Sequence, residues 1–401
     1  MQGVIRWKLR LDWIINQLLS FPFNKLDPYV LNILRMSVYQ IYFMNKVPEF
    51  AIVNESVTLA KAKGKHVANI VNAVLRNLCR NKDKIKFPDK KEDPIKFLSI
   101  FYSYPKWLIK KWIKELGWND TEKLLEIGNK PPNITIRVNR LKTSRDILVT
   151  KLSQLNIKTL LTKYSPDGII IKKLALPISE IPSYKKGLFF VQDEASQLCS
   201  YILKPEPGDK ILDICAGLGL KSLHIAELIK KKGKIIALDI NPKRLLILAH
   251  ASLRCNIDII KPVIGNALYA SSFFNCTFDK ILVDAPCSGL GTISKHPDIK
   301  WTKSEKDIKK ILPRIQINIL NEASKLLNKH GKILYATCTI SKEENEMVVF
   351  SFLKNHPEMK LLDISSEIPW LKDLTDKNGF FKSYPHVHNM DGFFCALFCK
   401  S

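Results

Sequence analysis

Two cysteines each follow a short apolar run that is typical of a buried strand. Cys287 lies in DAPCSGLG, directly after Ile281–Val283, and Cys338 lies in YATCTI, after GKIL. One such cysteine alone would most simply be a small buried residue, because cysteine is among the most buried residue types. Two of them at the ends of successive strands should open onto the same crevice. A thiolate there could add to an aromatic base, and a second thiol or base could help to release the product.

A glycine-containing loop follows an earlier expected strand, in DICAGLGLKS. Gly217 and Gly219 allow a tight turn close to a ligand, and a helix beginning near Lys221 offers free amide groups. The spacing fits neither the Walker loop nor G-x-G-x-x-G. Asp239 ends the next strand, where an acidic residue often binds a ribose, and Asn266 could hydrogen-bond an adenine edge. Together these positions predict a nucleoside-containing cofactor, with S-adenosylmethionine ahead of NAD.

The elements that would position these residues begin at about Leu188. DKILDICAG, GKIIALDI, DKILVDAP and GKILYATCTI are short strand-like runs, and helical segments such as KSLHIAELIKKKG separate them. This alternation predicts a mostly parallel, doubly wound α/β sheet, here assigned to a domain of residues 186–401. Such sheets bind ligands beyond the carboxyl ends of their strands, where all the residues named above fall.

The preceding part of the chain has a different pattern. Residues 1–85 lack strand alternation and predict an all-α domain, with Asp27 and Pro28 starting the helix in LDPYVLNILRMSVYQIYFM. The charged, proline-containing stretch NKDKIKFPDKKEDP reads as a linker. Residues 86–185 combine a helical segment with the alternating run PNITIRVNRLK, which predicts a linker followed by a small α+β domain.

The composition narrows the classes of function. The 401 residues carry a formal net charge of +25, spread along the chain, which suits a polyanion such as structured RNA, although solvated lysine faces are the alternative. No apolar run is long enough for a bilayer, so we expect no membrane partner. Nine cysteines without a C-x-x-C pair argue against a zinc site and for reduced thiols. We expect a cytoplasmic monomer without metal.

Several motifs carry a resemblance to a known family. VQDEAS, DICAGLGLKS, DAPCSGLGTISKHPDIKW, YATCTISKEENE and DGFF resemble the motifs of the Sun (Fmu) family of RNA cytosine-5 methyltransferases, and IRVNRLK resembles the segment ahead of its catalytic domain. LDPYVLNILRMSVYQIYF, VNESVTLAK and VNAVLRNL resemble the NusB-like RNA-binding domain of the bacterial small-subunit rRNA enzyme. GVIRWKLRLDWII matches a region inside that domain, so its first helices are expected to be absent. The resemblance implies a Rossmann-like methyltransferase domain behind NusB-like and α+β domains.

The resemblance also implies a reaction, the S-adenosylmethionine-dependent methylation of carbon 5 of a cytosine in small-subunit (16S) rRNA. Cys338 would add to carbon 6 of the base, and Cys287 would assist loss of the carbon 5 proton and elimination of Cys338. Asp284 would contact the cytosine edge, with Lys221 in the same catalytic set. The base must be unpaired or flipped out. The residues expected to line the cofactor are Cys215, Ala216, Gly217, Leu218, Gly219, Leu220, Lys221, Asp239, Asn266 and Asp284.

The chain departs from the family loop C-A-A-P-G-G-K-T at two bulky positions. Leu218 replaces a proline and Leu220 a glycine, which predicts crowding of the turn, while Gly217 in place of an alanine adds flexibility, so whether cofactor binding is weakened stays open. Asn266 stands where an aspartate is common. Two alternatives therefore stay open. One is a DNA cytosine-5 methyltransferase in which Cys287 attacks, and the other is a non-catalytic RNA-binding ribosome-assembly factor with a decayed cofactor loop.

Two further groups of polar residues have simple interpretations. Glu343, Glu344 and Glu346 are expected to begin a helix, because acidic side chains favour the amino-terminal end of the helix dipole. His296 and Lys300, in KHPDIKW, either hold an RNA phosphate or cap a loop.

Overall fold

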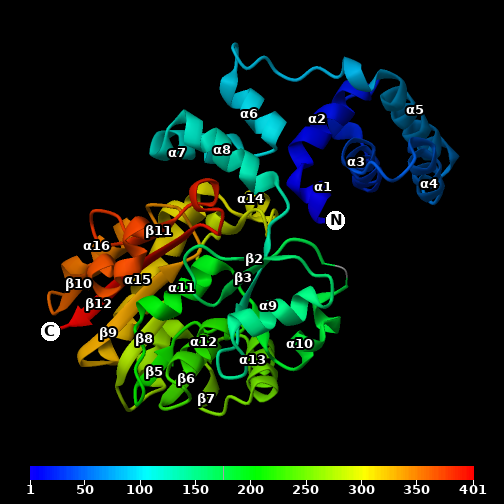
Figure 1. The fold of residues 1–401 in the computed structure, drawn as a ribbon. Helices are drawn as coiled ribbons and strands as arrows, with labels where there is room; N and C mark the ends of the chain where they lie inside the picture. Colours follow the sequence, from blue (N-terminus) through cyan, green and yellow to red (C-terminus); the bar gives the residue numbers. More distant parts are fainter. Residues whose placement is uncertain (175) are drawn as a thin grey trace. The chain divides into compact units, whose positions relative to one another are not determined.

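The computed structural model describes residues 1–174 and 176–401, and within them the chain divides into two compact units (Figure 1). The first unit contains Met1–Pro131 together with the short segment Ile293–Thr302. The second contains Pro132–Thr292 and Lys303–Ser401. The chain therefore leaves the second unit just after the Cys287 loop and returns to it ten residues later.

The first unit is helical. Helix α3 begins as the sequence predicts, because Asp27 Oδ1 accepts from the backbone N–H of Tyr29 at 2.8 Å and Pro28 occupies the first turn. The apolar stripes of α2 to α5 pack into one core that includes Leu34 and Leu75. The helices are α1 (Gln2–Arg6), α2 (Lys8–Leu18), α3 (Pro28–Phe43), α4 (Glu49–Lys61), α5 (Lys65–Asn81), α6 (Pro94–Tyr102), α7 (Lys106–Leu116), α8 (Trp118–Asn129) and α14 (Ile299–Thr302).

Lys300, on α14, lies inside this helical unit with 1% of its surface exposed. Its Nζ lies 3.6 Å from the centroid of the Tyr104 ring. It donates to three oxygens, namely Asn129 Oδ1 at 2.7 Å and the carbonyl oxygens of Arg6 at 3.1 Å and Ser103 at 3.2 Å. Burial lowers the pKa of Lys300 well below its ordinary value, although three acceptors favour the charged form. Of the two alternatives for Lys300, binding of an RNA phosphate is therefore excluded, because its amine is enclosed by protein.

The second unit begins with a small antiparallel sheet in the order β2-β3-β1-β4. Alternating residues of β1 and β3 pack against helix α9 in a core of their own, which includes Ile136, Ile169 and Leu148. The elements are β1 (Ile134–Val138), α9 (Arg145–Ser153), β2 (Thr159–Leu161), β3 (Gly168–Ile171), α10 (Pro182–Lys185) and β4 (Phe189–Val191).

The larger sheet of this unit has eight strands, with the path β10-β12-β9-β8-β5-β6-β7 and β11 paired to β12. Strands β7, β6, β5, β8 and β9 run parallel, whereas β12 lies antiparallel between β9 and β10. The predicted doubly wound α/β architecture is confirmed. The strands are β5 (Lys210–Asp213), β6 (Lys234–Asp239), β7 (Ile260–Ile264), β8 (Phe278–Asp284), β9 (Leu327–Thr337), β10 (Met359–Leu362), β11 (Phe381–Ser383) and β12 (Phe393–Lys400).

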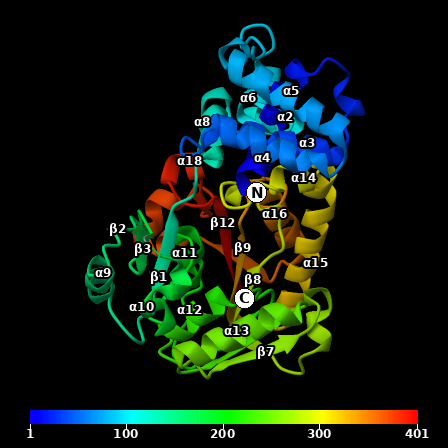
Figure 2. The ribbon, with the colours of Figure 1, turned by 90° about the vertical axis from the view of Figure 1, so that its right-hand side faces the viewer.

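Helices cover both faces of this sheet, as Figure 2 shows. Leu198, Leu223 and Leu245, from α11, α12 and α13, enter the core on one face, and Ile319 and Val348, from α15 and α16, enter the core on the other. The bounds are α11 (Glu194–Ile202), α12 (Leu220–Leu228), α13 (Pro242–Cys255), α15 (Leu312–Lys325), α16 (Glu346–Asn355), α17 (Ile364–Glu367) and α18 (Pro385–His388). Among the described residues, no helix combines the length and the apolar character that crossing a membrane requires.

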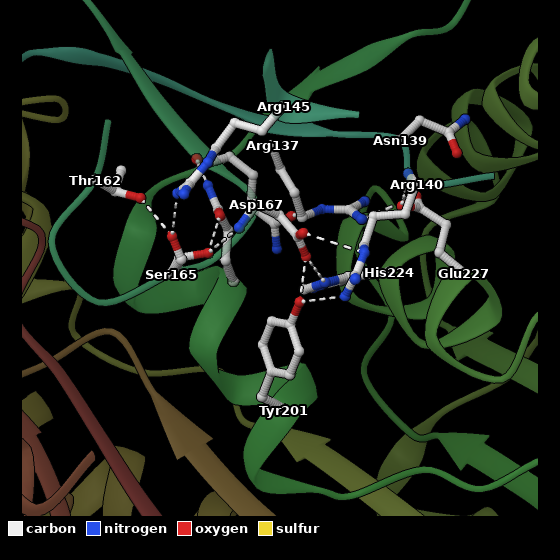
Figure 3. Close-up of polar contacts among 12 residues, drawn as sticks. Arg137, Asn139, Arg140, Arg145, Thr162, Ser165, Asp167, Tyr201, His224 and Glu227 are labelled. Carbon is white, nitrogen blue, oxygen red and sulfur yellow. Dashed lines mark hydrogen bonds and ion pairs between the residues drawn. The ribbon is translucent and has the colours of Figure 1, made fainter. Parts of the chain in front are cut away.

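A buried ion pair joins the small sheet to helix α12 (Figure 3). The guanidinium of Arg137, on β1, lies 2.8 Å from the Glu227 carboxylate, and neither side chain is exposed to solvent. Arg137 Nε also donates to Gln192 Oε1 at 2.6 Å. Burial raises the pKa of Glu227 to about 7, against the opposing influence of Arg137.

A second polar group lies beside that pair in Figure 3. Asp167, which precedes β3, accepts a hydrogen bond from the Tyr201 hydroxyl and lies 3.4 Å from His224 Nε2 and 3.5 Å from Arg140 Nε. Burial lowers the pKa of His224 to about 3, so the imidazole is neutral. His224 and Glu227 both lie on α12, so the small sheet is fixed against the helix that follows the glycine loop.

Candidate active site

The two predicted cysteines meet at the end of the large sheet. Strands β8 and β9 are parallel neighbours, with Asp284 in register with Ala336, so the loops that follow them emerge side by side. The Sγ atoms of Cys287 and Cys338 are 3.2 Å apart. The backbone N–H of Gly291 donates to the Cys338 carbonyl at 3.1 Å and adds a further link between the two loops.

The two thiols are electrostatically distinct. The hydrogen bond to Cys338 and then burial raise the pKa of Cys287 well above its ordinary value, and the nearby Glu344 carboxylate adds to the effect. Cys287 is therefore held as a thiol that can donate to the Cys338 sulfur. A proton donor beside a second sulfur is the arrangement that a two-thiol mechanism needs.

Lys221 and Asp284 form an ion pair, with Lys221 Nζ donating to Asp284 Oδ2 at 2.6 Å. Burial acts to lower the pKa of Lys221, but the Asp284 carboxylate outweighs it, and the net pKa lies above its ordinary value. The Lys221 side chain is 10% exposed and that of Asp284 is 31% exposed. The pair therefore offers a fixed positive charge and an accessible carboxylate to a ligand.

The glycine loop folds against the end of β6. The backbone N–H of Gly217 donates to Asp239 Oδ2 at 2.8 Å, and that of Gly219 donates to the Ala216 carbonyl at 2.8 Å. Both glycines have positive φ, 57° and 74°. A Cβ atom on Gly219 would lie 2.2 Å from Leu248 Cδ1. The turn therefore requires glycine at 219 for its backbone conformation and for the space beside α13.

The two bulky residues of this loop leave the turn open. The Leu218 side chain is 46% exposed, so it points away from the turn. Leu220 is the first residue of α12 and packs against the core beneath the sheet. The expected crowding of the turn is therefore wrong, and weaker cofactor binding loses its geometric reason.

A cavity of about 210 Å³ opens at the carboxyl ends of the parallel strands. Of the predicted cofactor residues, Cys215, Asp239, Asn266 and Asp284 line it, whereas residues 216–221 do not. Its apolar wall is formed by Ile240, Leu268, Ile315 and Ile319. Arg244, on α13, also lines the cavity and was not predicted, because nothing in PKRLLILAH separates it from an ordinary solvated arginine.

The polar atoms of this cavity are already partly engaged. Asp239 Oδ1 accepts from the backbone N–H of Asn241 at 2.8 Å. Asn266 Oδ1 accepts from the backbone N–H of Leu268 at 3.0 Å, which leaves its Nδ2 amide to donate to a base edge. Burial, with nearby carboxylates, raises the pKa of Cys215 well above its ordinary value, so this cysteine is an inert wall residue.

One residue of the site differs from its sequence interpretation. Helix α16 begins at Glu346, and Glu344 lies before it with no exposed surface. The Glu344 carboxylate accepts from the backbone N–H of Ser288 at 2.7 Å, directly after Cys287. The expectation that these glutamates begin a helix is therefore confirmed for Glu346 and wrong for Glu343 and Glu344, which lie in the turn before α16. For Glu344 the only signal in the sequence was its position six residues after Cys338, which does not reveal a contact with Ser288.

The matches to protein families cover the parts of the chain separately. A family model described as 16S rRNA methyltransferase RsmB/F matches residues 200–399. A model of the NusB family matches residues 1–80, and a model of the RsmF/B-like ferredoxin-like domain matches residues 104–178. The chain thus has a helical NusB domain, a ferredoxin-like middle domain and a mixed-sheet methyltransferase domain.

Similar proteins span nearly the whole chain. The "Probable ribosomal RNA small subunit methyltransferase B" of Bacillus subtilis is 35% identical over 98% of this chain and 88% of its own length. The crystal structure of PH0851 is 30% identical, with a TM-score of 0.85 over 99% of this chain and 88% of that one. NSun6 from Pyrococcus horikoshii, solved with SFG, is 25% identical, with a TM-score of 0.66 over 75% of this chain and 99% of that one. The chain belongs to the RsmB/F family of 16S rRNA methyltransferases.

Proposed function

We propose that this protein methylates carbon 5 of a specific cytosine in 16S rRNA, using S-adenosylmethionine and a covalent Cys338–cytosine intermediate. The observation that carries the proposal is the pair of thiols 3.2 Å apart at the ends of adjacent parallel strands. Asp284 is the last residue of β8, which is one of those strands. It forms the ion pair with Lys221 and also lines the cavity. Pro286, the residue before Cys287, lines the cavity together with Asp284, which supports a reaction of the two thiols beside the cofactor site.

The residues of the cavity fit the proposed cofactor. The carboxylate of Asp239 suits ribose hydroxyls, and the apolar wall suits an adenine ring. The Asn266 amide can donate to a ring nitrogen of adenine, because its carbonyl oxygen already caps Leu268. When bound, S-adenosylmethionine supplies an electrophilic methyl group.

In the addition step, Cys338 Sγ attacks carbon 6 of the flipped-out cytosine and makes carbon 5 nucleophilic. The Cys287 thiol, whose Sγ lies 3.2 Å from Cys338 Sγ, can donate a hydrogen bond to the attacking sulfur. Asp284 accepts from the exocyclic amino group of the base. Lys221, held by Asp284, places a positive charge where electron density builds up on the ring.

In the release step, the carbon 5 proton leaves and the bond between carbon 6 and Cys338 breaks. Cys287 passes its own proton to the departing Cys338 sulfur and accepts the proton from carbon 5. The electron pair of the C–H bond forms the C5=C6 double bond. Both cysteines finish as thiols, so the step balances without another reactant.

Trapping with 5-fluorocytosine RNA tests these roles, because fluorine at carbon 5 blocks release. We expect the wild-type protein to form a stable adduct and Cys338→Ala to form none. We expect Cys287→Ala to accumulate adduct even on ordinary cytosine RNA, whereas Cys276→Ala, at an exposed cysteine, serves as the matched control. An adduct with Cys338→Ala would sink the nucleophile assignment, and the absence of any adduct with Cys287→Ala would reverse the two roles.

The substrate assignment rests on the family and on the net charge of +25. We assign the placement of the rRNA to residues 1–85 and 86–185, ahead of the catalytic domain in 186–401. Bisulfite mapping of 16S rRNA, with and without the protein, should reveal one protected cytosine. Calorimetry with S-adenosylmethionine checks the cofactor, and no heat of binding at millimolar cofactor would instead favour a non-catalytic assembly factor.

A further inference from the structure

The two cysteine loops share a buried polar layer beneath the thiols, and Glu344 is its centre. The Glu344 carboxylate accepts from three donors, and they come from three different segments of the chain. They are the backbone N–H of Ser288 at 2.7 Å, Gln316 Nε2 at 3.2 Å and Thr339 Oγ1 at 3.4 Å. Ser288 directly follows Cys287, and Thr339 directly follows Cys338. One side chain therefore contacts the neighbours of both thiols.

Other contacts in this layer link the same two loops. The hydroxyl oxygens of Ser288 and Thr339 are 2.8 Å apart, so the residues after the two cysteines bond directly. Gln316, on α15, donates to the Pro286 carbonyl at 3.0 Å as well as to Glu344. The Tyr335 hydroxyl donates to the backbone carbonyl of Glu344 at 2.6 Å and fixes it to β9. The Cys287 loop is thus held on both sides of its thiol.

The hydrogen-bonding pattern indicates an ionised carboxylate. Three of its neighbours donate to it, and an ionised carboxylate can only accept. Burial raises the pKa of Glu344, while the bonds from Ser288, Gln316 and Thr339 oppose that shift. The charge of Glu344 in turn raises the pKa of Cys287.

The neighbouring acids are engaged elsewhere. Glu343 is partly buried and accepts from the Ser341 hydroxyl at 2.8 Å, and Glu346 lies 2.6 Å from Lys382 Nζ. Glu343 serves as the matched control, because it carries the same charge one residue away from Glu344.

We propose that Glu344 is a positioning residue that holds the Cys287 and Cys338 loops in register, so that both thiols reach one cytosine. The inference rests on the proposed two-thiol function and adds a residue that does not touch the base. A displacement of about 1 Å at a reacting centre can cost on the order of 100-fold in rate. A small shift of one cysteine loop against the other should therefore slow the reaction.

The first experiment measures the thiols without RNA. Diamide takes two hydrogens from neighbouring thiols and joins the sulfurs as a disulfide. Because a thiolate starts this reaction, the rate is divided by the alkylation rate of Cys287 at the same pH, and the ratio reports how often Cys287 and Cys338 meet. In Glu344→Gln, an NH2 group replaces one carboxylate oxygen, so at least one of the three bonds must rearrange, which loosens a loop. We expect cross-linking, read as the Cys287–Cys338 peptide by mass spectrometry, to slow by roughly 10- to 100-fold. Glu343→Gln should match the wild type.

The second readout is the pH profile of alkylation by iodoacetamide, followed at Cys287. Removing the negative charge of Glu344 should move the profile of Cys287 to lower pH. A residue that merely supported the fold would slow alkylation or speed it without this directional shift. A folded Glu344→Gln protein with wild-type cross-linking and a wild-type alkylation profile would overturn the proposal.

Thr339 supplies a pair of variants that keeps the test decisive if Glu344→Gln does not fold. Thr339→Val keeps the side-chain shape but removes the bonds to Glu344 and Ser288, whereas Thr339→Ser keeps the hydroxyl. We expect slow cross-linking in the valine variant and rescue in the serine variant. Equal rates in the two variants would contradict the proposed linkage of the loops.

Finally, single-turnover trapping on 5-fluorocytosine RNA tests whether the alignment of the two cysteine loops affects the rate at which Cys338 attacks the base. We expect Glu344→Gln and Thr339→Val to trap more slowly than Glu343→Gln and Thr339→Ser, with unchanged RNA affinity. If the wild-type protein traps no RNA, the proposed function fails, and the RNA-free thiol measurements still decide the role of Glu344. If trapping is wild-type in all four variants while cross-linking slows, the loops do not need this register for attack and the proposal fails.

Discussion

Lys300 provides a stringent test of how the helical unit is held together. Replacing it by methionine keeps a straight side chain of similar length and removes the amine. The variant leaves three buried oxygens without their donor, those of Asn129, Arg6 and Ser103, which lie 2.7–3.2 Å from Lys300 Nζ in the wild type. It also removes the amine that lies 3.6 Å from the Tyr104 ring.

The expected change in the free energy of unfolding of Lys300→Met follows from two opposing effects. Each buried acceptor that loses its partner costs about 1–3 kcal/mol. Against this, the wild-type protein must desolvate the Lys300 amine, and methionine avoids that cost. We therefore expect Lys300→Met to lower the free energy of unfolding by about 3 kcal/mol, the lower end of the sum over three unpaired acceptors, because methionine avoids the desolvation of the amine.

Urea denaturation monitored by tryptophan fluorescence measures this loss, because Trp112 and Trp301 belong to the same unit as Lys300. Lys110→Met, at an exposed position on α7, is the matched control and should change stability by no more than about 0.5 kcal/mol. If Lys300→Met lowers the free energy of unfolding by less than about 1 kcal/mol relative to that control, the reasoning is refuted. The three bonds would then not stabilise the fold by more than desolvation of the Lys300 amine destabilises it.

Three further predictions concern the cofactor side of the sheet. Gly219→Ala should weaken S-adenosylmethionine binding in calorimetry by about 10- to 100-fold, because alanine is strained at a φ of 74° and its Cβ displaces the Leu248 side chain; unchanged affinity would contradict the loop geometry. Asn266→Ala should weaken that binding about tenfold, which is roughly the contribution of one hydrogen bond. Asn266→Asp keeps an oxygen that accepts from the backbone N–H of Leu268 and should bind S-adenosylmethionine at least as well as the alanine variant. Burial raises the pKa of Asp213 to about 7, so this group contributes stability below its ordinary value of 3.8 that is lost as pH rises through about 7. The fall in Tm from pH 5 to pH 8 should therefore be shallower in Asp213→Asn, and an identical slope would show that Asp213 is not protonated in the folded state.

The meeting of the two thiols could be predicted from local patterns. Cys287 and Cys338 each follow an apolar run, and the carboxyl ends of parallel neighbouring strands lie at one edge of a sheet. The same rule placed Asp239, Asn266 and Asp284 at the cavity. These predictions needed only the order of the elements along the chain and the edge of the sheet at which each strand ends.

The roles of Glu344 and Lys300 could not be predicted in this way. Each depends on partners remote in sequence, since Glu344 meets Ser288 and Lys300 meets Arg6 and Asn129. Both are charged residues in polar stretches, and charged side chains in such stretches are usually exposed. Only tertiary packing distinguishes a buried charge with several partners from a solvated one. The crowding expected from Leu218 failed for a related reason, because the direction of its side chain is set by the turn and not by its size.

The strand order of the large sheet has a consequence for synthesis of the protein. Strand β12 follows all the other strands in the chain, yet it lies between β9 and β10 and pairs along most of β9. A nascent chain on the ribosome cannot complete this sheet until residues up to about Lys400 have emerged, whereas the helices of residues 1–81 can pack much earlier. The NusB domain can thus mature while the catalytic half is still an open sheet, with the apolar edge of β9 uncovered. A pause or truncation before β12 is made would leave that edge available for aggregation, so release of a well-folded catalytic domain depends on synthesis of this one strand.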